Sequence, residues 1–295
     1  MTDGGTTARV TAGFGRNYLV EDARGVARLA TRRGKRGDII VGDQVRLSLD
    51  SFGQAVIEAA LPRASVLMRA EGTREKTLAA NIEQIAIVYA ARPAFNPHFV
   101  WRALLAAHGA GIDALVILNK NDLPDLAPAR AFLAQLAVLG YRTLALSAKG
   151  GATVARESLL PVLRDRNTLL VGQSGMGKST LLNLLVPDAG ARTQDFSLRL
   201  NLGRQTTSSS RWFHLPHGGA LVDSPGFQTF GLRHLDQREL AAAMPDLARA
   251  AGQCRFADCR HLDEPDCAVR AALAHGEIDP ARYAFYRHVM AELDG

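Results

Sequence analysis

Cysteine is scarce in this chain of 295 residues: there are three, and all of them lie between positions 254 and 267. This distribution does not suit the disulfide framework of a secreted protein. Long hydrophobic runs are also missing, because no apolar stretch approaches the roughly 20 residues of a membrane span. The first ten residues, MTDGGTTARV, lack the apolar core of a signal peptide. We therefore expect a cytoplasmic monomer that has no membrane partner.

Acidic residues are outnumbered by basic ones, 29 against 35, which gives a formal net charge of +6 and a sequence pI of about 9.5. This balance favours a polyanionic partner such as nucleic acid. The alternative is that the basic balance reflects genome composition and not a partner, because arginine and alanine are abundant, as a GC-rich genome would produce. The basic run from Arg28 to Arg36 holds five basic residues and no acidic one.

The first part of the chain, residues 9 to 61, contains short β-type runs separated by Gly, Asp and Arg clusters. Several short strands at close spacing predict a small barrel, and an OB-fold is the usual compact solution. We assign residues 1–65 to this domain. The basic run would then form a loop that meets a phosphate backbone, unless it is an ordinary solvated loop. Residues 62–76 are interpreted as a connector.

Between Ile82 and Phe230 the pattern changes to buried, β-branched runs that alternate with helical stretches. Runs such as IAIVYA, ALVILN and TLLVG are typical of a parallel sheet. The alternation predicts a doubly wound α/β domain, which binds ligands at the carboxyl ends of its strands. We assign residues 66–234 to it. Residues 235–295 form a third domain, in which CAVRAALAHG and PARYAFYRHVMAEL are expected to be helical.

The run TLLVGQSGMGKSTLLN has the spacing of a P-loop, with Gly172, four residues, and then Gly177-Lys178-Ser179. The glycines let backbone N–H groups turn inward around a phosphate chain. Lys178 can reach the β- and γ-phosphates, and Ser179 can ligate Mg²⁺. The helix that begins at Lys178 directs its positive end at the anion. The predicted nucleotide-binding residues here are Gly172, Gln173, Ser174, Gly175, Met176, Gly177, Lys178, Ser179 and Thr180.

Two further polar motifs follow predicted strands. In Asn119-Lys120-Asn121-Asp122, the Asp122 carboxylate can accept two hydrogen bonds from guanine that adenine cannot offer. Asn119 would brace the loops, and the Lys120 stem would cover the base. A polar turn after a buried strand would also explain this motif. In Ser147-Ala148-Lys149, backbone N–H groups can meet the guanine O6.

A fourth motif, Asp223-Ser224-Pro225-Gly226, follows the last apolar run. Asp223 would hold Mg²⁺ through water, and the Gly226 N–H would sense the γ-phosphate. The preceding polar segment GRQTTSSS suits a switch loop in which Thr206 or Thr207 closes on Mg²⁺. Four such motifs at strand ends indicate a GTPase.

The order of these motifs is that of a circularly permuted GTPase, because the guanine motifs precede the P-loop and DSPG comes last. The same sheet can form, since permutation only moves the chain breaks between neighbouring elements. The second switch, which follows DSPG, then runs directly into the tail.

The tail contains Cys254, Cys259, His261 and Cys267 with the spacing C-x4-C-x-H-x5-C. Three thiolates and an imidazole suit a closed tetrahedral Zn²⁺ site. Because the ligand count is full, we expect one structural zinc ion per chain and no catalytic water on it. The alternative is three reduced cysteines packed in a small core.

The permuted order, the loop GQSGMGKST, the motif DSPGF and the run CRFADCRH…EPDC together resemble the RsgA (YjeQ) family over nearly the whole chain. The resemblance implies a bacterial GTPase that acts in maturation of the small ribosomal subunit and binds it near the decoding region. It also implies slow intrinsic hydrolysis of GTP that the subunit stimulates. The implied ligands are GTP or GDP with Mg²⁺, zinc and ribosomal RNA.

Two positions bear on the hydrolytic step. Phe227 stands where Ras-like enzymes have a water-orienting Gln, and an apolar side chain cannot position water. Family members usually have His at the position of Gln205, and Gln can bind a water but cannot act as a base near neutral pH. Two rival functions stay open. One is a metabolic P-loop kinase, against which NKND argues, and the other is a non-ribosomal nucleic-acid-binding module that the GTPase switches.

Overall fold

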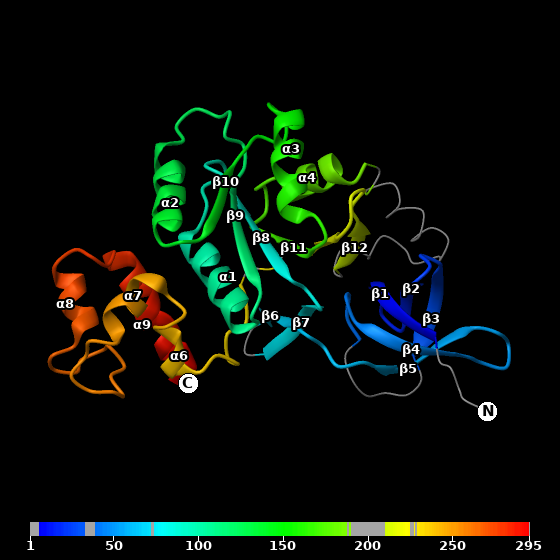
Figure 1. Ribbon diagram of the computed structural model, residues 1–295, viewed down its shortest axis with the longest axis horizontal. Helices are drawn as coiled ribbons and strands as arrows, with labels where there is room; N and C mark the ends of the chain where they lie inside the picture. Colours follow the sequence, from blue (N-terminus) through cyan, green and yellow to red (C-terminus); the bar gives the residue numbers. More distant parts are fainter. Residues whose placement is uncertain are drawn as a thin grey trace.

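The computed structural model describes residues 6–32, 39–71, 74–187, 189, 210–224, 227 and 229–294. The described chain is elongated in Figure 1, with a barrel towards the N-terminus, an α/β region in the middle and a group of helices at the C-terminal end. Within the described residues, no helix combines the length and the apolar character needed to cross a membrane.

The predicted OB-type barrel is confirmed. Its strands pair in the order β1-β2-β3-β5-β4, and β4 closes the barrel on β1. Residues alternate between the two faces of each strand, so that Val10, Val45 and Ile57 fill the interior. The expectation that the basic run forms a loop is wrong for its first part, because Arg28 and Arg32 lie on β3, which pairs with β2 and β5. Positions 33 to 38 are outside the described residues. The strands are β1 (Thr6–Phe14), β2 (Asn17–Asp22), β3 (Ala27–Arg32), β4 (Gln44–Leu49) and β5 (Ala55–Ala60).

The expected connector at residues 62–76 is wrong, because most of it belongs to an antiparallel hairpin. Strand β6 (Val66–Glu71) pairs with β7 (Arg74–Ala80). The hairpin buries Leu67 and Leu78, while Lys76 and Glu71 form an ion pair near its tip. The sequence did not indicate this hairpin, because the charged residues at its tip interrupt the few apolar residues that pack it on the core.

The middle of the chain forms the predicted α/β sheet, with strand order β10-β9-β8-β11-β13-β12. Neighbouring strands run parallel except β12, which is antiparallel to β13. Helices α1 and α2 cover one face, and α3 and α4 cover the other (Figure 1). The elements are β8 (Gln84–Tyr89), α1 (Pro97–Gly109), β9 (Asp113–Leu118), α2 (Ala127–Val138), β10 (Arg142–Ala145), α3 (Ala152–Leu163), β11 (Asn167–Val171), α4 (Lys178–Leu185), β12 (Arg211–His214) and β13 (Ala220–Asp223).

Strand β12 joins the barrel to the α/β sheet, because Ala12 of β1 pairs with Arg211. The Arg9 guanidinium lies 4.2 Å from the centre of the Trp212 ring, and Glu21 pairs with His214 at 2.8 Å. These contacts make the two sheets continuous and connect the barrel to the strand that follows the predicted switch loop.

The C-terminal helices pack against α1 and share its hydrophobic core. The ring of Phe285 lies 5.3 Å from that of His98 and 5.4 Å from that of Trp101, measured between centroids. The predicted helices in CAVRAALAHG and PARYAFYRHVMAEL are confirmed as α8 and α9. The elements are α6 (Gln237–Leu240), α7 (Pro245–Ala251), α8 (Ala268–Ala274) and α9 (Pro280–Asp294).

Candidate functional site

The P-loop motif connects β11 to α4, so its backbone turns at the carboxyl end of a central strand. Gly172 has a φ of 153°, and a Cβ there would lie 2.3 Å from the Val88 carbonyl oxygen. Gly177 has a φ of 97°, and its Cβ would lie 2.3 Å from the side-chain nitrogen of Asn119. Both glycines are therefore needed for the loop to fit against the neighbouring strand ends.

The Lys178 ammonium lies inside this loop. Its Nζ donates to the carbonyl oxygens of Gly172 at 2.6 Å and Gln173 at 3.2 Å. Burial lowers the pKa of Lys178, and the nearby Asp223 carboxylate opposes that shift. A phosphate chain bound in the loop would give this desolvated ammonium a negatively charged partner.

The guanine motif after β9 is tied directly to the P-loop. The Asn119 side-chain amide, which is 1 % exposed, donates to the Met176 carbonyl at 2.9 Å and accepts from the Ala148 N–H at 3.1 Å. Lys120 donates to the Gly175 carbonyl at 2.7 Å. Asn119 therefore joins three of the predicted motifs, which are far apart in the sequence.

The Asp122 carboxylate is exposed and accepts a hydrogen bond from the Ser147 hydroxyl. This bond lowers the pKa of Asp122, so the side chain is ionised at neutral pH and acts as an acceptor. Lys149, two residues after Ser147, is also exposed, and Arg130 Nε donates to the Asn121 side-chain oxygen at 3.1 Å. An acceptor-only group at this position matches the two N–H donors of a guanine edge.

Asp223 ends β13 next to β11, which leads into the P-loop. Burial raises the pKa of Asp223, while the Lys178 and Arg211 charges lower it less strongly. Ser179 and Thr180 lie in the first turn of α4, and Ser174 is exposed in the loop. A desolvated carboxylate close to an ammonium suits a site that binds phosphate together with Mg²⁺. Four predicted residues lie outside the described residues: Gln205, Thr206, Thr207 and Gly226.

Sequence reasoning missed the loop between β8 and α1, which also contacts the P-loop. The Arg92 carbonyl accepts from Lys120 Nζ at 2.8 Å. The Asn96 N–H donates to the Gln173 side-chain oxygen at 2.9 Å, and Asn96 also caps α1. The sequence could have indicated this loop, because it follows a parallel strand whose neighbours carry the predicted motifs at their ends.

The four predicted metal ligands lie together, with all four ligand atoms within 4.8 Å of one another. Cys254 Sγ is 3.4 Å from His261 Nδ1 and 3.9 Å from Cys267 Sγ, and Cys267 Sγ is 3.5 Å from that nitrogen. Zinc–ligand bonds of roughly 2.0–2.3 Å at tetrahedral angles require such separations. The cluster therefore fits a metal bound by three sulfurs and one nitrogen.

Helix α9 supports the backbone of this cluster. The Tyr283 hydroxyl donates to the His261 carbonyl, and the Tyr286 hydroxyl donates to the Arg260 carbonyl, both at 2.7 Å. The Glu264 carboxylate accepts from the N–H groups of Arg260 and Leu262, each at 2.8 Å. These contacts fix the loop that carries His261, as the surroundings of metal ligands commonly do.

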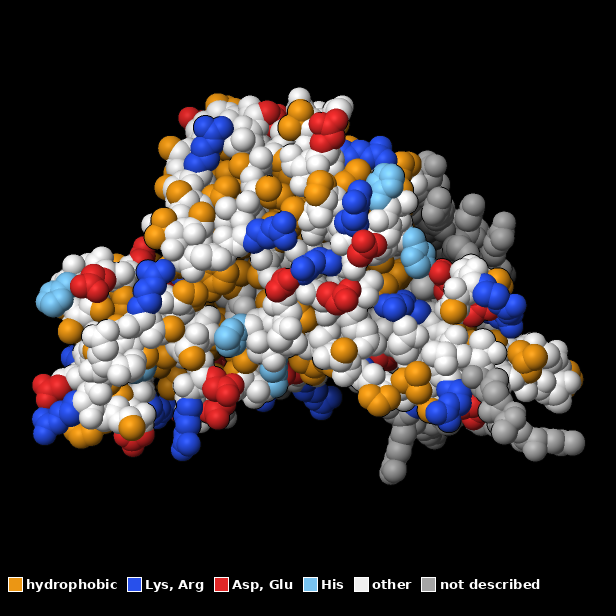
Figure 2. Space-filling view, in the orientation of Figure 1, with side chains coloured by type: hydrophobic (Ala, Val, Ile, Leu, Met, Phe, Trp, Pro, Cys, Tyr) orange, Lys and Arg blue, Asp and Glu red, His pale blue; other side chains and the backbone are white. Residues whose placement is uncertain are grey.

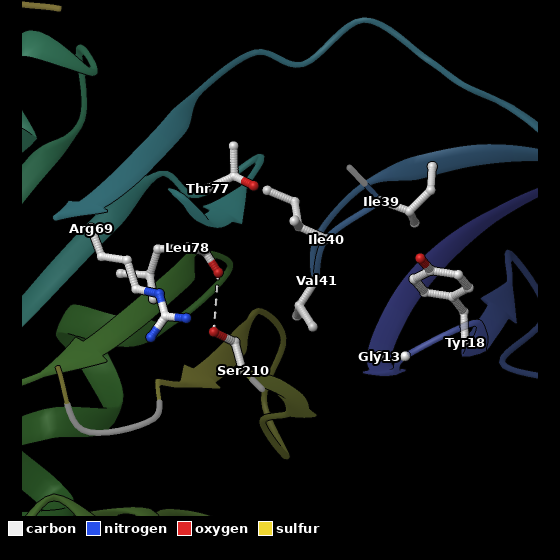
Figure 3. Close-up of a pocket in the computed structure, with 10 residues that line it drawn as sticks. Gly13, Tyr18, Ile39, Ile40, Val41, Arg69, Thr77, Leu78 and Ser210 are labelled. Carbon is white, nitrogen blue, oxygen red and sulfur yellow. Dashed lines mark hydrogen bonds between the residues drawn. The ribbon is translucent and has the colours of Figure 1, made fainter. Parts of the chain in front are cut away.

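A cavity of about 220 Å³ lies between the barrel and the β6–β7 hairpin. Figure 3 shows Tyr18, Ile39 and Arg69 around it, and the Ser210 hydroxyl donating to the Leu78 carbonyl at 3.0 Å. None of the predicted site residues lines this cavity. This cavity is therefore separate from the group of loops at the strand ends.

Comparison with known proteins agrees with this geometry. The model of the RsgA GTPase family matches residues 60–233. The chain is 46 % identical over 285 residues to the small ribosomal subunit biogenesis GTPase RsgA of Bordetella pertussis, covering 96 % of this chain and 95 % of that protein. It is 46 % identical over 286 residues to the protein of the same name from Burkholderia pseudomallei, covering 96 % and 91 %.

Two solved structures share the fold. YjeQ from Thermotoga maritima superposes with a TM-score of 0.74 at 28 % identity, covering 98 % of this chain and 99 % of that one. YloQ, described as a circularly permuted GTPase, has a TM-score of 0.72 at 23 % identity and covers 99 % and 96 %. The similarity thus extends over the barrel, the α/β region and the C-terminal helices.

Proposed function

This chain belongs to the RsgA family of GTPases, and we propose that it hydrolyses GTP to GDP and phosphate while assisting late maturation of the small ribosomal subunit. The observation that carries the proposal is the Asn119 side chain, which connects the P-loop to both guanine motifs. A single bound nucleotide would contact the phosphate-binding and base-reading loops together. A kinase with an adenine site would not need Asp122 in its acceptor-only state.

We propose roles for the P-loop and for the residues that would hold Mg²⁺ beside it. Lys178 would contact the β- and γ-phosphates, and the N–H groups of residues 172 to 180 would surround the phosphate chain. Ser179, Asp223 and a switch threonine, Thr206 or Thr207, would hold Mg²⁺. When bound, Mg²⁺ offsets the negative charge that develops on the transferred phosphoryl group.

Slow intrinsic hydrolysis is expected from the second switch. Phe227 packs 6.0 Å from Phe99 and 4.7 Å from Phe230, measured between ring centroids, so it occupies an apolar cluster. A side chain in that position cannot orient the attacking water. We propose Gln205 as the residue that binds the water, with the subunit bringing it into place.

The C-terminal cluster is proposed to hold one structural Zn²⁺ through Cys254, Cys259, His261 and Cys267. Bound zinc would keep the three thiols deprotonated and link the loop to α8, which begins at Ala268. The contacts from α9 would then transmit this order to the rest of the C-terminal helices.

Ribosomal RNA is the proposed polyanionic partner, and a cytoplasmic monomer is the form that would meet it. On the face shown in Figure 2, Lys and Arg side chains are interspersed with Asp and Glu. The basic run at residues 28–36 is therefore the stronger candidate for phosphate contact. We name the ribosome rather than another nucleic acid because the similar proteins are named for small-subunit biogenesis.

Sedimentation with purified small subunits tests this proposal. The protein should cosediment in the presence of a non-hydrolysable GTP analogue, and neutralising Arg28 and Arg32 together with positions 33 and 36 should weaken binding and flatten its salt dependence. Neutralising Arg74, Arg142, Arg156 and Arg164, which lie outside the barrel and the C-terminal helices, removes the same number of charges and is the matched control. Binding to large subunits alone, or to none, would refute the assignment.

A further inference from the structure

Helix α1 lies between the α/β sheet and the C-terminal helices (Figure 1). Its N-cap residue, Asn96, contacts the P-loop through Gln173. One face of the helix carries Phe99, which packs on the Phe230 ring at a centroid distance of 5.9 Å. His98 and Trp101 contact α9 through Phe285. One helix thus touches the P-loop, the end of the second switch and the C-terminal helices.

Arg102 of α1 connects two of these partners through one side chain. Its Nε donates to the Phe230 carbonyl at 2.6 Å. Its two terminal nitrogens donate to the two carboxylate oxygens of Glu292 on α9, at 2.7 and 2.5 Å. Arg102 is only 7 % exposed, whereas the Glu292 side chain is 32 % exposed. The guanidinium is planar and rigid, so its two acceptors must hold fixed positions relative to each other.

The Phe230 carbonyl, which accepts from Arg102, lies in a segment that is itself held in place. We call residues 229–231 the post-switch segment, because they follow the DSPGF motif. This segment pairs with β6: the Ala70 N–H donates to the Thr229 carbonyl at 3.1 Å, and the Gly231 N–H donates to the Met68 carbonyl at 3.0 Å. Phe230 is fully buried. Because Arg102 bonds to the Phe230 carbonyl, a change at the second switch that moves the post-switch segment must also move or break the Arg102 contact.

We propose that Arg102 is a positioning residue that couples the second switch to the C-terminal helices, so that the nucleotide state sets how these helices are presented to the small subunit. This inference rests on the proposed function. It goes beyond chain continuity, because a side chain 128 positions away from Phe230 carries the coupling. The apolar contacts of Trp101 with Phe285 keep the helices docked in either nucleotide state.

Two substitutions in the full-length protein test the coupling. Arg102→Lys keeps the charge but loses the planar fork, and Glu292→Gln keeps the size but loses the charge at a partly exposed position that tolerates it. Asp294→Asn is the matched control, since Asp294 on the same helix pairs with Arg260 within the C-terminal region. The measurement is the dissociation constant for small subunits with a GTP analogue and with GDP, together with the KM for GTP without subunits.

The coupling is measured by the ratio of the dissociation constant with GDP to that with the GTP analogue. We expect each coupling variant to reduce this ratio by about five- to tenfold, at the lower end of typical coupling between sites. The KM without subunits and the control variant should be unchanged, which a merely structural role for Arg102 would not produce. If both coupling variants keep the full ratio, the inference is overturned and the proposed function stands. If the unsubstituted protein binds small subunits equally with both nucleotides, only the inference is overturned; if it binds no small subunits, the proposed function falls as well.

Discussion

The side-chain amide of Asn119 donates to the backbone carbonyl of Met176 across 57 positions of the sequence. This bond holds the loop proposed to read the base against the loop proposed to bind phosphate, and Lys120 reinforces it through the Gly175 carbonyl. The distance between the base site and the phosphate site is therefore fixed by buried groups. Such a site selects a nucleotide by its base without needing a large rearrangement on binding.

Asp122→Asn should change the base preference. The carboxylate accepts from guanine, whereas an amide can also donate, and the carbonyl of xanthine accepts such a donor. We expect the affinity for GTP to fall by about 10- to 100-fold, while xanthosine triphosphate becomes the better ligand. Competition binding with both nucleotides measures this. Asp125→Asn, an exposed change in the same loop that only loses the Arg92 pair, should keep the GTP preference; continued preference for GTP in Asp122→Asn would refute the base-reading role.

Asp223→Asn should stabilise the nucleotide-free protein while reducing hydrolysis. Burial raises the pKa of Asp223 above its ordinary 3.8, so the fold disfavours its ionised form. The sign follows from linkage: the ionised carboxylate lowers the free energy of unfolding at neutral pH, and this penalty disappears as the pH falls through the raised pKa towards 3.8. The amide variant should unfold at a higher temperature at neutral pH, and the difference should vanish below the ordinary carboxyl range. A difference that is unchanged at low pH would contradict this origin.

Cys259→Ser should remove the metal and loosen the C-terminal helices. Metal analysis should find about one zinc per unsubstituted chain, because the four ligands form a closed set. Loss of the cluster should speed amide hydrogen exchange in α9, whose tyrosines hold the loop around His261. Asp258→Asn changes the adjacent residue, which is not a ligand, and should retain the zinc. A metal-free protein with fully protected helices would show that the cysteines are only packed in a core.

The parts of the fold that the sequence predicts well are those with a strong local pattern. The barrel strands alternate between faces, the sheet strands such as β8 are continuously buried, and the P-loop and Cys/His spacings are set by ligand geometry. The two guanine motifs also lie beside the P-loop as expected. Each of these signals is contained in a short stretch of chain.

The features that the sequence misses depend on tertiary packing. Strand β12 is only four residues long and exists because β1 and β13 flank it. The β6–β7 hairpin has a charged tip, and its apolar residues are too few to give a clear period. The sequence around Arg102 does not distinguish it from other helical arginines, because its partners Phe230 and Glu292 are far away along the chain.

The rate of GTP turnover with and without purified small subunits tests the account most directly. We expect slow turnover alone and a rise of at least about tenfold with subunits, which corresponds to about 1.4 kcal/mol in the activation barrier. Lys178→Ala should lose about 10²- to 10³-fold under both conditions, because it removes the phosphate contact, whereas Lys76→Ala, on the hairpin, should behave as the unsubstituted protein. Turnover that is equal with and without subunits, or equally fast with ATP, would contradict the assignment of this chain as a subunit-stimulated GTPase.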